Sequence, residues 1–142
     1  MRALNPRAWS IDSECWCTRV DYDGYKEEWS GIVPVLAPDN RSKRIGEVED
    51  TNIIVEFPTG IKDKNGQKIY EGDIVTFMVE RFDSITLGFD SEQWHTAVVE
   101  WNQDDACYSF VDGDEPFSVQ FEAEVIGNIH EHPELLEAND VD

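Results

Sequence analysis

The chain has 142 residues, of which 31 are acidic and 11 are basic, and its formal net charge is −20 at pH 7. Its hydrophobic content of 40%, with 5 Trp, 4 Tyr and 7 Phe, excludes global disorder and predicts a folded core. The longest uncharged apolar stretch, Trp29–Pro38, is half of the ~20 residues that a membrane-spanning helix needs, and three cysteines do not make a disulfide framework.

The negative charge is distributed unevenly. Residues 1–48 contain 7 basic and 8 acidic residues (net −1), and residues 49–80 contain 3 and 7 (net −4). Residues 81–142 contain 1 basic and 16 acidic residues, a net of −15. Contact with nucleic-acid phosphates needs Lys and Arg, so direct nucleic-acid binding by the C-terminal half is disfavoured, as is binding to an anionic membrane.

The N-terminal part predicts extended segments separated by turns and one polar loop. These are a hairpin of Pro6–Ile11 with Glu14–Tyr22 across Asp12-Ser13, a turn at Asp23-Gly24, an extended segment at Trp29–Leu36, a loop at Arg41–Glu49 and a strand at Asn52–Phe57.

The stretch from Phe57 to Phe77 contains the highest density of residues that indicate a particular local structure. Asn65-Gly66 predicts a hairpin with a type I′ turn, because both central positions of that turn need φ > 0. Ile61 and Ile69 flank the turn and are expected to face one another. After a second turn, the β-branched and aromatic run Ile74–Val79 predicts a strand that is buried on both faces.

The C-terminal part predicts further strands and one short helix. The predicted elements are a loop at Arg81–Gln93, strands at His95–Trp101, Ala106–Val111 and Phe117–Val125, a bulge at Gly127-Asn128 and a helix at Pro133–Ala138. Phe117–Val125 has the clearest alternation, with Val119, Phe121, Ala123 and Val125 expected to face the core.

Short strands and turns dominate this pattern, and they predict a β-dominated fold, all-β or α+β. The expected architecture is one domain built as a small SH3-like open barrel. It consists of a β-rich N-terminal segment (residues 1–51), the barrel-like core (52–130) and a C-terminal tail with the short helix (131–142).

The central stretch also resembles the signature of the YopX family, through Thr59–Gly66 followed by Ile69–Val75. Three further segments agree in order along the chain: Arg7-Ala8-Trp9, Val98–Trp101, and Val125–Ile129 with Pro133–Leu136. The resemblance implies a protein encoded by a bacteriophage or prophage, and therefore expressed in the cytoplasm of a bacterial host. It implies no enzymatic activity, since none is established for the family.

Some positions depart from the family pattern. Pro58 precedes Thr59 where an uninterrupted strand end is expected, and His130 and His132 stand where the family has Tyr and Asn. Relative to the family pattern, Ser84–Trp94 resembles an inserted segment. Trp94, at the end of this segment, is the one tryptophan not expected in the core, and is a candidate contact for a partner.

Residues of chemical interest lack the spacing of known sites. Cys15 and Cys17 with His130 and His132 do not have the spacing of a zinc knuckle, and the acidic turns lack the pattern of a calcium loop. Cys107 with His95 matches no nucleophile motif, and no phosphate-binding loop is found. We therefore assign no catalytic, cofactor-binding or metal residue and expect a protein that is not an enzyme.

The remaining candidate site is the acidic second half. A folded surface with spaced carboxylates either keeps the protein soluble or presents a negative field to a basic partner, as a mimic of DNA. The candidate interaction surface comprises Glu100, Asp104, Asp105, Asp112, Asp114, Glu115, Glu122 and Glu124, together with Trp94.

The predicted function is protein–protein interaction with a host or phage protein, and unpaired strand edges permit a homo-oligomer. The alternatives are an acidic inhibitor of a host DNA-binding protein, and a nucleic-acid-processing accessory or enzyme with an undetected site.

Overall fold

The computed structural model describes residues 5–37, 40–83, 88–119 and 122–137, and it divides the chain into two compact units. The N-terminal unit comprises residues 3–57 and the C-terminal unit begins at Pro58. The predicted barrel-like core began at residue 52. The structure instead places residues 53–56 in the N-terminal unit, because they pair with a strand near the start of the chain.

The first sheet of the N-terminal unit has the order β2-β1-β6, from β1 (Arg7–Ser10), β2 (Cys15–Trp16) and β6 (Ile53–Glu56). The predicted hairpin across Asp12-Ser13 is confirmed, since β1 and β2 pair antiparallel. Its second arm was expected to run to Tyr22, and this is wrong. The arm ends at Trp16, and the chain then enters a different sheet.

That second sheet consists of β3 (Arg19–Asp23), β4 (Glu28–Ala37) and β5 (Asn40–Asp50), in this order. β4 confirms the extended segment predicted at Trp29–Leu36. The loop predicted at Arg41–Glu49 is wrong, because the chain there pairs with β4 as part of β5. β5 is a sheet edge, and edge strands commonly carry charged side chains, so a polar sequence did not reveal it.

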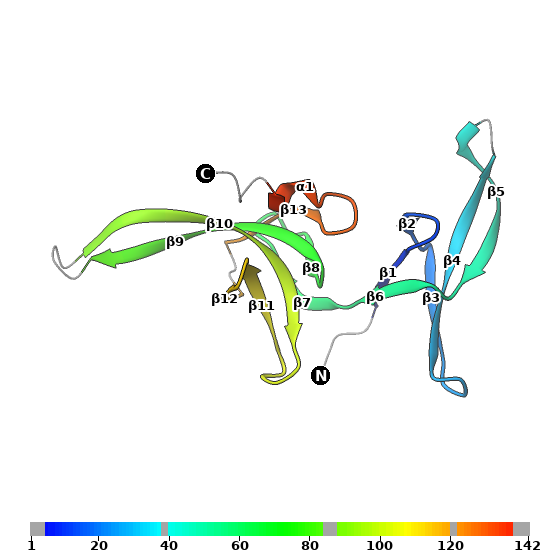
Figure 1. The fold of residues 1–142 in the computed structure, drawn as a ribbon, viewed down its shortest axis with the longest axis horizontal. Coiled ribbons are helices and arrows are strands. Elements are labelled where there is room, and N and C mark those ends of the chain that lie inside the picture. Colours follow the sequence, from blue (N-terminus) through cyan, green and yellow to red (C-terminus); the bar gives the residue numbers. More distant parts are fainter. Residues whose placement is uncertain (1–4, 38–39, 84–87, 120–121, 138–142) are drawn as a thin grey trace. The chain divides into compact units, whose positions relative to one another are not determined.

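The C-terminal unit contains a five-stranded antiparallel sheet of order β12-β11-β10-β9-β13 (Figure 1). Its strands are β9 (Asp73–Asp83), β10 (Gly88–Asn102), β11 (Cys107–Asp112), β12 (Glu115–Ser118) and β13 (Glu124–Asn128). The loop predicted at Arg81–Gln93 is wrong for the described residues, since β9 and β10 pair as far as Asp83 and Gly88. The predicted strand at His95–Trp101 is confirmed as part of β10.

The single strand predicted at Phe117–Val125 is wrong. Its two ends belong to β12 and β13, which lie at opposite edges of the sheet. Ala123 is fully buried, as predicted, whereas Phe121 lies outside the described residues. The alternation of apolar residues continued across the break because side chains before and after it pack against the same core.

The hairpin of β7 (Pro58–Lys62) and β8 (Lys68–Tyr70) confirms the prediction made from Asn65-Gly66. The type I′ turn is wrong, because Gly66 has a positive φ of 85° and Asn65 does not. The Gly66 N–H donates to the Asp63 carbonyl (3.0 Å), and the Asp63 N–H donates to the Gln67 carbonyl (2.8 Å). This pattern is a type I turn followed by a left-handed glycine bulge.

Asp63 fastens this hairpin to β13. Its buried carboxylate accepts hydrogen bonds at Oδ1 from the N–H groups of Asn65 and Gln67 (both 2.9 Å). Its Oδ2 accepts one from Val125 at the start of β13 (3.0 Å). Burial by itself would raise the pKa of Asp63, but these three hydrogen bonds, with the nearby Lys64, hold that pKa below its ordinary value.

The core of the C-terminal unit lies between the sheet and this hairpin. Its buried members are Ile69, Val75, Phe77, Ala97, Val99, Phe110 and Ala123. Ile61 packs against the same cluster as Ile69, as expected, and Ile74 and Val75 are both fully buried, which confirms a strand covered on both faces. The sheet is open within the described residues, since β12 and β13 are its two edges.

The structure is therefore β-dominated, and its helix α1 (Glu134–Glu137) confirms the short helix predicted near the C-terminus. Among the described residues, no helix has the length and apolarity to cross a lipid bilayer.

Candidate interaction surface

The turn between β10 and β11 presents two of the predicted carboxylates. The side chain of Asn102 organises this turn, because its Oδ1 accepts hydrogen bonds from the N–H groups of Asp104 (3.0 Å) and Asp105 (3.2 Å). Its Nδ2 donates to the carboxylate of Asp105 (3.0 Å), and Ala106 completes the turn with φ of 52°. Asp104 and Asp105 are exposed, so the turn holds both charges in solvent at fixed positions.

The turn between β11 and β12 presents two more of the predicted carboxylates. Asp112 and Glu115 are paired, which leaves Gly113 and Asp114 as a two-residue loop. Gly113 has φ of 63°, as the first position of a type II′ turn requires. Asp114 and Glu115 are exposed.

Asp112 differs from the exposed carboxylates of the two turns, because its carboxylate contacts a histidine. Its Oδ2 lies 2.7 Å from Nδ1 of His95, whose ring is stacked on Phe77 and contacts Phe117. The structure does not bring His95 together with Cys107. Cys107 pairs with Asn102, seven residues along β10 from His95, which corresponds to roughly 23 Å.

A shallow hollow lies beside the β10–β11 turn. Its volume is about 240 Å³, and it is lined by Glu100, Trp101, Asn102, Gln103, Ser109, Val111 and Pro116. The Trp101 indole packs edge-on against Tyr108 at 4.8 Å, and its Nε1–H donates to Gln103 (2.9 Å). Glu100 is exposed at this hollow, so apolar and acidic atoms meet there.

The last two predicted carboxylates lie elsewhere. Glu124 is on β13, and its carboxylate forms an ion pair with Lys64 (3.2 Å). β13 and β12 are separated by four strand spacings, or about 19 Å. The exposed Glu122 is close to Glu124 in the chain. The predicted set therefore divides into a group on β10–β12 and a smaller group at β13.

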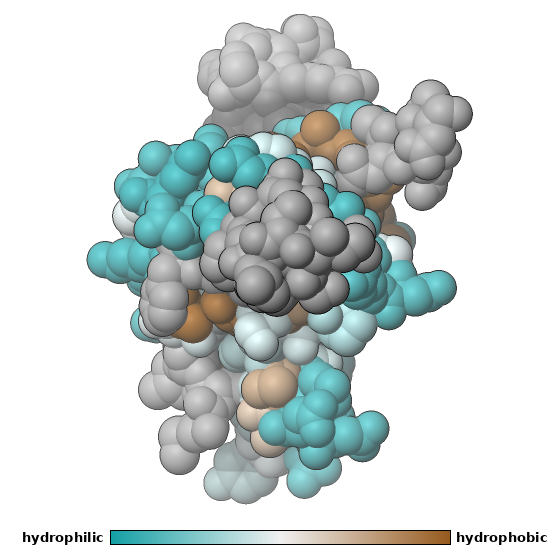
Figure 2. All heavy atoms as spheres, turned by 90° about the vertical axis from the view of Figure 1, so that its left-hand side faces the viewer, coloured by the Kyte–Doolittle hydropathy of each residue, from teal (hydrophilic) through white to brown (hydrophobic). Residues whose placement is uncertain are grey.

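Trp94 is strongly exposed, at 69% of its surface, as expected for a candidate partner contact. It lies on β10 opposite Met78 of β9, and the neighbouring pair is Glu92 with Glu80. Sequence reasoning did not group Met78, Glu80 and Glu92 with Trp94, because residues 81–93 were read as a loop and the pairing of β10 with β9 was therefore not expected. Among the residues that are coloured in Figure 2, hydrophilic ones predominate and the hydrophobic areas are small and separated.

Of the residues considered for a metal, Cys15 and Cys17 lie in the N-terminal unit, whereas His130 and His132 lie in the C-terminal unit. Among the described residues, no group of three or more His, Cys, Asp or Glu has the arrangement of a metal site. Burial, and then the charge of Asp50, raise the pKa values of Cys15 and Cys17. Both thiols are therefore held in their protonated form at neutral pH.

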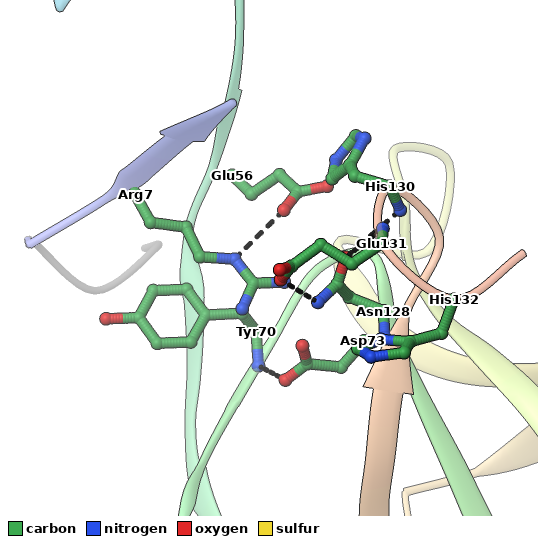
Figure 3. Close-up of polar contacts among 8 residues, drawn as sticks. All are labelled: Arg7, Glu56, Tyr70, Asp73, Asn128, His130, Glu131 and His132. Atoms are coloured by element: carbon green, nitrogen blue, oxygen red, sulfur yellow. Dashed lines mark hydrogen bonds and ion pairs between the residues drawn. The ribbon is translucent and has the colours of Figure 1, made fainter. Parts of the chain in front are cut away.

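The histidines belong to a loop that closes β13 (Figure 3). Oδ1 of the buried Asn128 accepts hydrogen bonds from the N–H groups of His130 (3.0 Å) and Glu131 (2.9 Å). Nδ1 of His132 accepts one from the Asn128 N–H (3.3 Å). The predicted bulge is confirmed by a register shift between Val125 and Gly127. A Cβ on Gly127 would lie 2.8 Å from His132 Nδ1, so this position requires glycine.

One charged pair is also prominent in the N-terminal unit. Nε of Arg7 lies 3.0 Å from Oε1 of Glu56, whose side chain is only 6% exposed (Figure 3). The guanidinium of Arg7 also lies over the Trp16 ring, 4.4 Å from its centroid. This pair joins β1 to β6 and stabilises the fold of this unit.

Comparison with known proteins identifies a matching family and a similar crystal structure. The family model described as YopX protein matches residues 6–137. The crystal structure of protein EF1440 from Enterococcus faecalis is similar to the chain with a TM-score of 0.56 and 25% sequence identity, covering 94% of this chain and 99% of that one. Comparison with curated protein sequences finds no match.

Proposed function

The chain belongs to the YopX family, and from this premise we propose that it is a phage- or prophage-encoded accessory protein that acts as a non-enzymatic protein-interaction module in the cytoplasm of its bacterial host. Its partner would be a basic protein surface, and the contact would be made by the β10–β12 group of carboxylates.

One observation carries this proposal. The exposed carboxylates of Asp104 and Asp105 lie on the tight turn at one end of β11, and those of Asp114 and Glu115 lie on the tight turn at its other end. The turns are held by hydrogen bonds from Asn102 and by a left-handed glycine, so little conformational entropy would be lost on binding. A pre-organised negative surface steers a positively charged partner and raises its association rate.

The body that presents this surface is, in our proposal, an SH3-like open barrel. Support comes from the open antiparallel sheet and from the β7–β8 hairpin, whose Ile69 joins the core of the sheet. The hydrogen bond from the Val125 N–H to Asp63 also joins the hairpin to the edge strand β13.

The proposal is tested by capture from host extract with a charge-neutral variant. The double variant Asp104→Asn/Asp105→Asn should recover at least about fivefold less basic partner at low salt, and recovery by the unmodified chain should fall steeply between about 50 and 200 mM salt. Glu27→Gln/Glu28→Gln removes two exposed charges from the N-terminal unit and serves as the matched control. Equal losses for the two variants would refute the proposal.

The same capture tests the DNA-mimic form of this function. A partner held at its own DNA-binding site should be released by duplex DNA at concentrations near its affinity for DNA. A partner that stays bound in excess duplex would show that a different surface is used. Nuclease, phosphatase and nucleotide-binding assays, with and without divalent metals, test the non-enzymatic part, and any turnover would contradict it.

A further inference from the structure

The outer end of the β9–β10 ribbon carries an unusual combination of side chains. Trp94 is paired with Met78 and Glu92 with Glu80, and the register is unbroken between these two pairs. Side chains two residues apart on a strand point to the same face. These four residues, which we name the Trp94 patch, therefore share one face of the sheet.

The opposite face of the same ribbon is the one that enters the core. His95 is paired with the fully buried Phe77, and Val79 packs against the core cluster. Because alternate residues point to opposite faces, Trp94 cannot reach this core without reversing the whole strand. Its exposure is thus a consequence of the register.

Two features of the Trp94 patch cost free energy in the isolated chain. Like charges directly across a strand pair repel one another, and within the described part of the chain neither Glu80 nor Glu92 forms an ion pair. The indole of Trp94 is 69% exposed to water. A ligand that is both cationic and able to stack would relieve both costs at once.

We propose that the Trp94 patch binds an arginine side chain of a basic protein segment. This inference rests on the proposed function and goes beyond it, since it adds a second contact surface for a basic partner and names the group that this surface recognises. A guanidinium stacks on an indole face and donates hydrogen bonds from its edge to carboxylates. Glu92 lies about 6.6 Å along β10 from Trp94, and Glu80 lies across from Glu92 at about 5 Å, so one guanidinium on the ring can reach both.

Arginine fits this face better than lysine does. An ammonium is a compact, strongly hydrated charge that forms no planar stack, whereas the guanidinium is more weakly hydrated and matches carboxylate geometry. The unbranched Met78 beside the indole provides an adaptable apolar surface for the methylene groups of the ligand.

The test measures fluorescence anisotropy of labelled octa-arginine and octa-lysine peptides titrated with the full chain. The unmodified chain should bind the arginine peptide several-fold more tightly than the lysine peptide. Trp94→Ala and Glu80→Gln/Glu92→Gln should each weaken arginine binding by about tenfold. Trp94→Tyr retains an aromatic face and should restore most of the affinity.

Glu27→Gln/Glu28→Gln removes the same number of exposed charges from the N-terminal unit and should weaken the arginine peptide by less than about threefold. Equal effects of the two double variants, no effect of Trp94→Ala, equal affinity for both peptides, or no binding of the arginine peptide would each overturn the inference. None of these outcomes refutes the proposed function, which is decided separately by capture with Asp104→Asn/Asp105→Asn against its Glu27/Glu28 control.

Discussion

Replacing Asp63 by alanine tests how the central hairpin is joined to the sheet. The substitution removes the acceptor of three backbone N–H groups, those of Asn65, Gln67 and Val125. The first two residues are exposed, so water can replace the lost acceptor and each loss costs about 0.5–1 kcal/mol. Val125 is partly buried against the core, and its unpaired N–H costs about 1–3 kcal/mol. The expected total is about 3–4 kcal/mol of unfolding free energy.

Hydrogen exchange measured by mass spectrometry is the appropriate assay, because it reports on peptides from the two units separately. In Asp63→Ala, peptides of β9, β10 and β13 should lose protection equivalent to about 3–4 kcal/mol. Asp63→Asn retains one oxygen but places an amide N–H against a second donor, and it should lose about half as much. Asp104→Ala, at an exposed turn, should change protection by less than about 0.5 kcal/mol. A loss below about 1 kcal/mol in Asp63→Ala would refute this reasoning.

The same carboxylate gives a defined pH dependence. The pKa of Asp63 is lowered in the folded chain, so the folded state favours the ionised form. Its stabilising contribution is fully present above the pKa of an unfolded aspartate, about 3.9, and is lost as the pH falls through the lower folded value. The difference in stability between the unmodified chain and Asp63→Ala should therefore be constant from neutral pH to about pH 5 and shrink below about pH 4. A difference that grows on acidification would contradict the assignment.

Two further predictions concern other parts of the chain. Gly127→Ala should lower the unfolding free energy by about 1–3 kcal/mol in a urea titration, because the new Cβ would collide with His132, whereas Gly24→Ala has open space and should change it by less than about 0.5 kcal/mol. Iodoacetamide at pH 8 should alkylate the exposed Cys107 before Cys15 and Cys17. Partial burial and raised pKa values protect the thiols of Cys15 and Cys17. Mass spectrometry of the digested protein should show this order of alkylation. Faster reaction of Cys15–Cys17 would contradict it.

The sequence predicted the features that depend on local chemistry. The hairpin at Asn65-Gly66 was recognised because few residues accept a positive φ, although Gly66 alone adopts it. The turn type was wrong because Asp63 supplies acceptors that favour a three-residue loop, and this depends on a side chain that appeared only as a solvated charge.

Features that depend on pairing between strands far apart in the sequence could not be predicted from local sequence patterns. In the segments read as loops at residues 41–49 and 81–93, the described residues belong to strands, because a neighbouring strand supplies their hydrogen bonds. No apolar period marks these segments in the sequence. For the same reason, Trp94 was identified as a candidate contact, while Glu80 and Glu92 were not. The proximity of Glu80 and Glu92 to Trp94 follows only from the register between β9 and β10.

The placement of carboxylates explains how so acidic a half of the chain can fold. The buried Asp63 and Asp73 accept hydrogen bonds from backbone N–H groups, Asp73 from that of Tyr70 (2.8 Å), so neither needs a basic partner. Exposed carboxylates such as Asp104 and Asp114 lie on turns, where solvent screens their mutual repulsion. Glu80 and Glu92 follow neither rule, since they oppose each other on a strand pair without a described counter-charge. Structural need accounts for the first two groups, and a ligand is the simplest reason for the third.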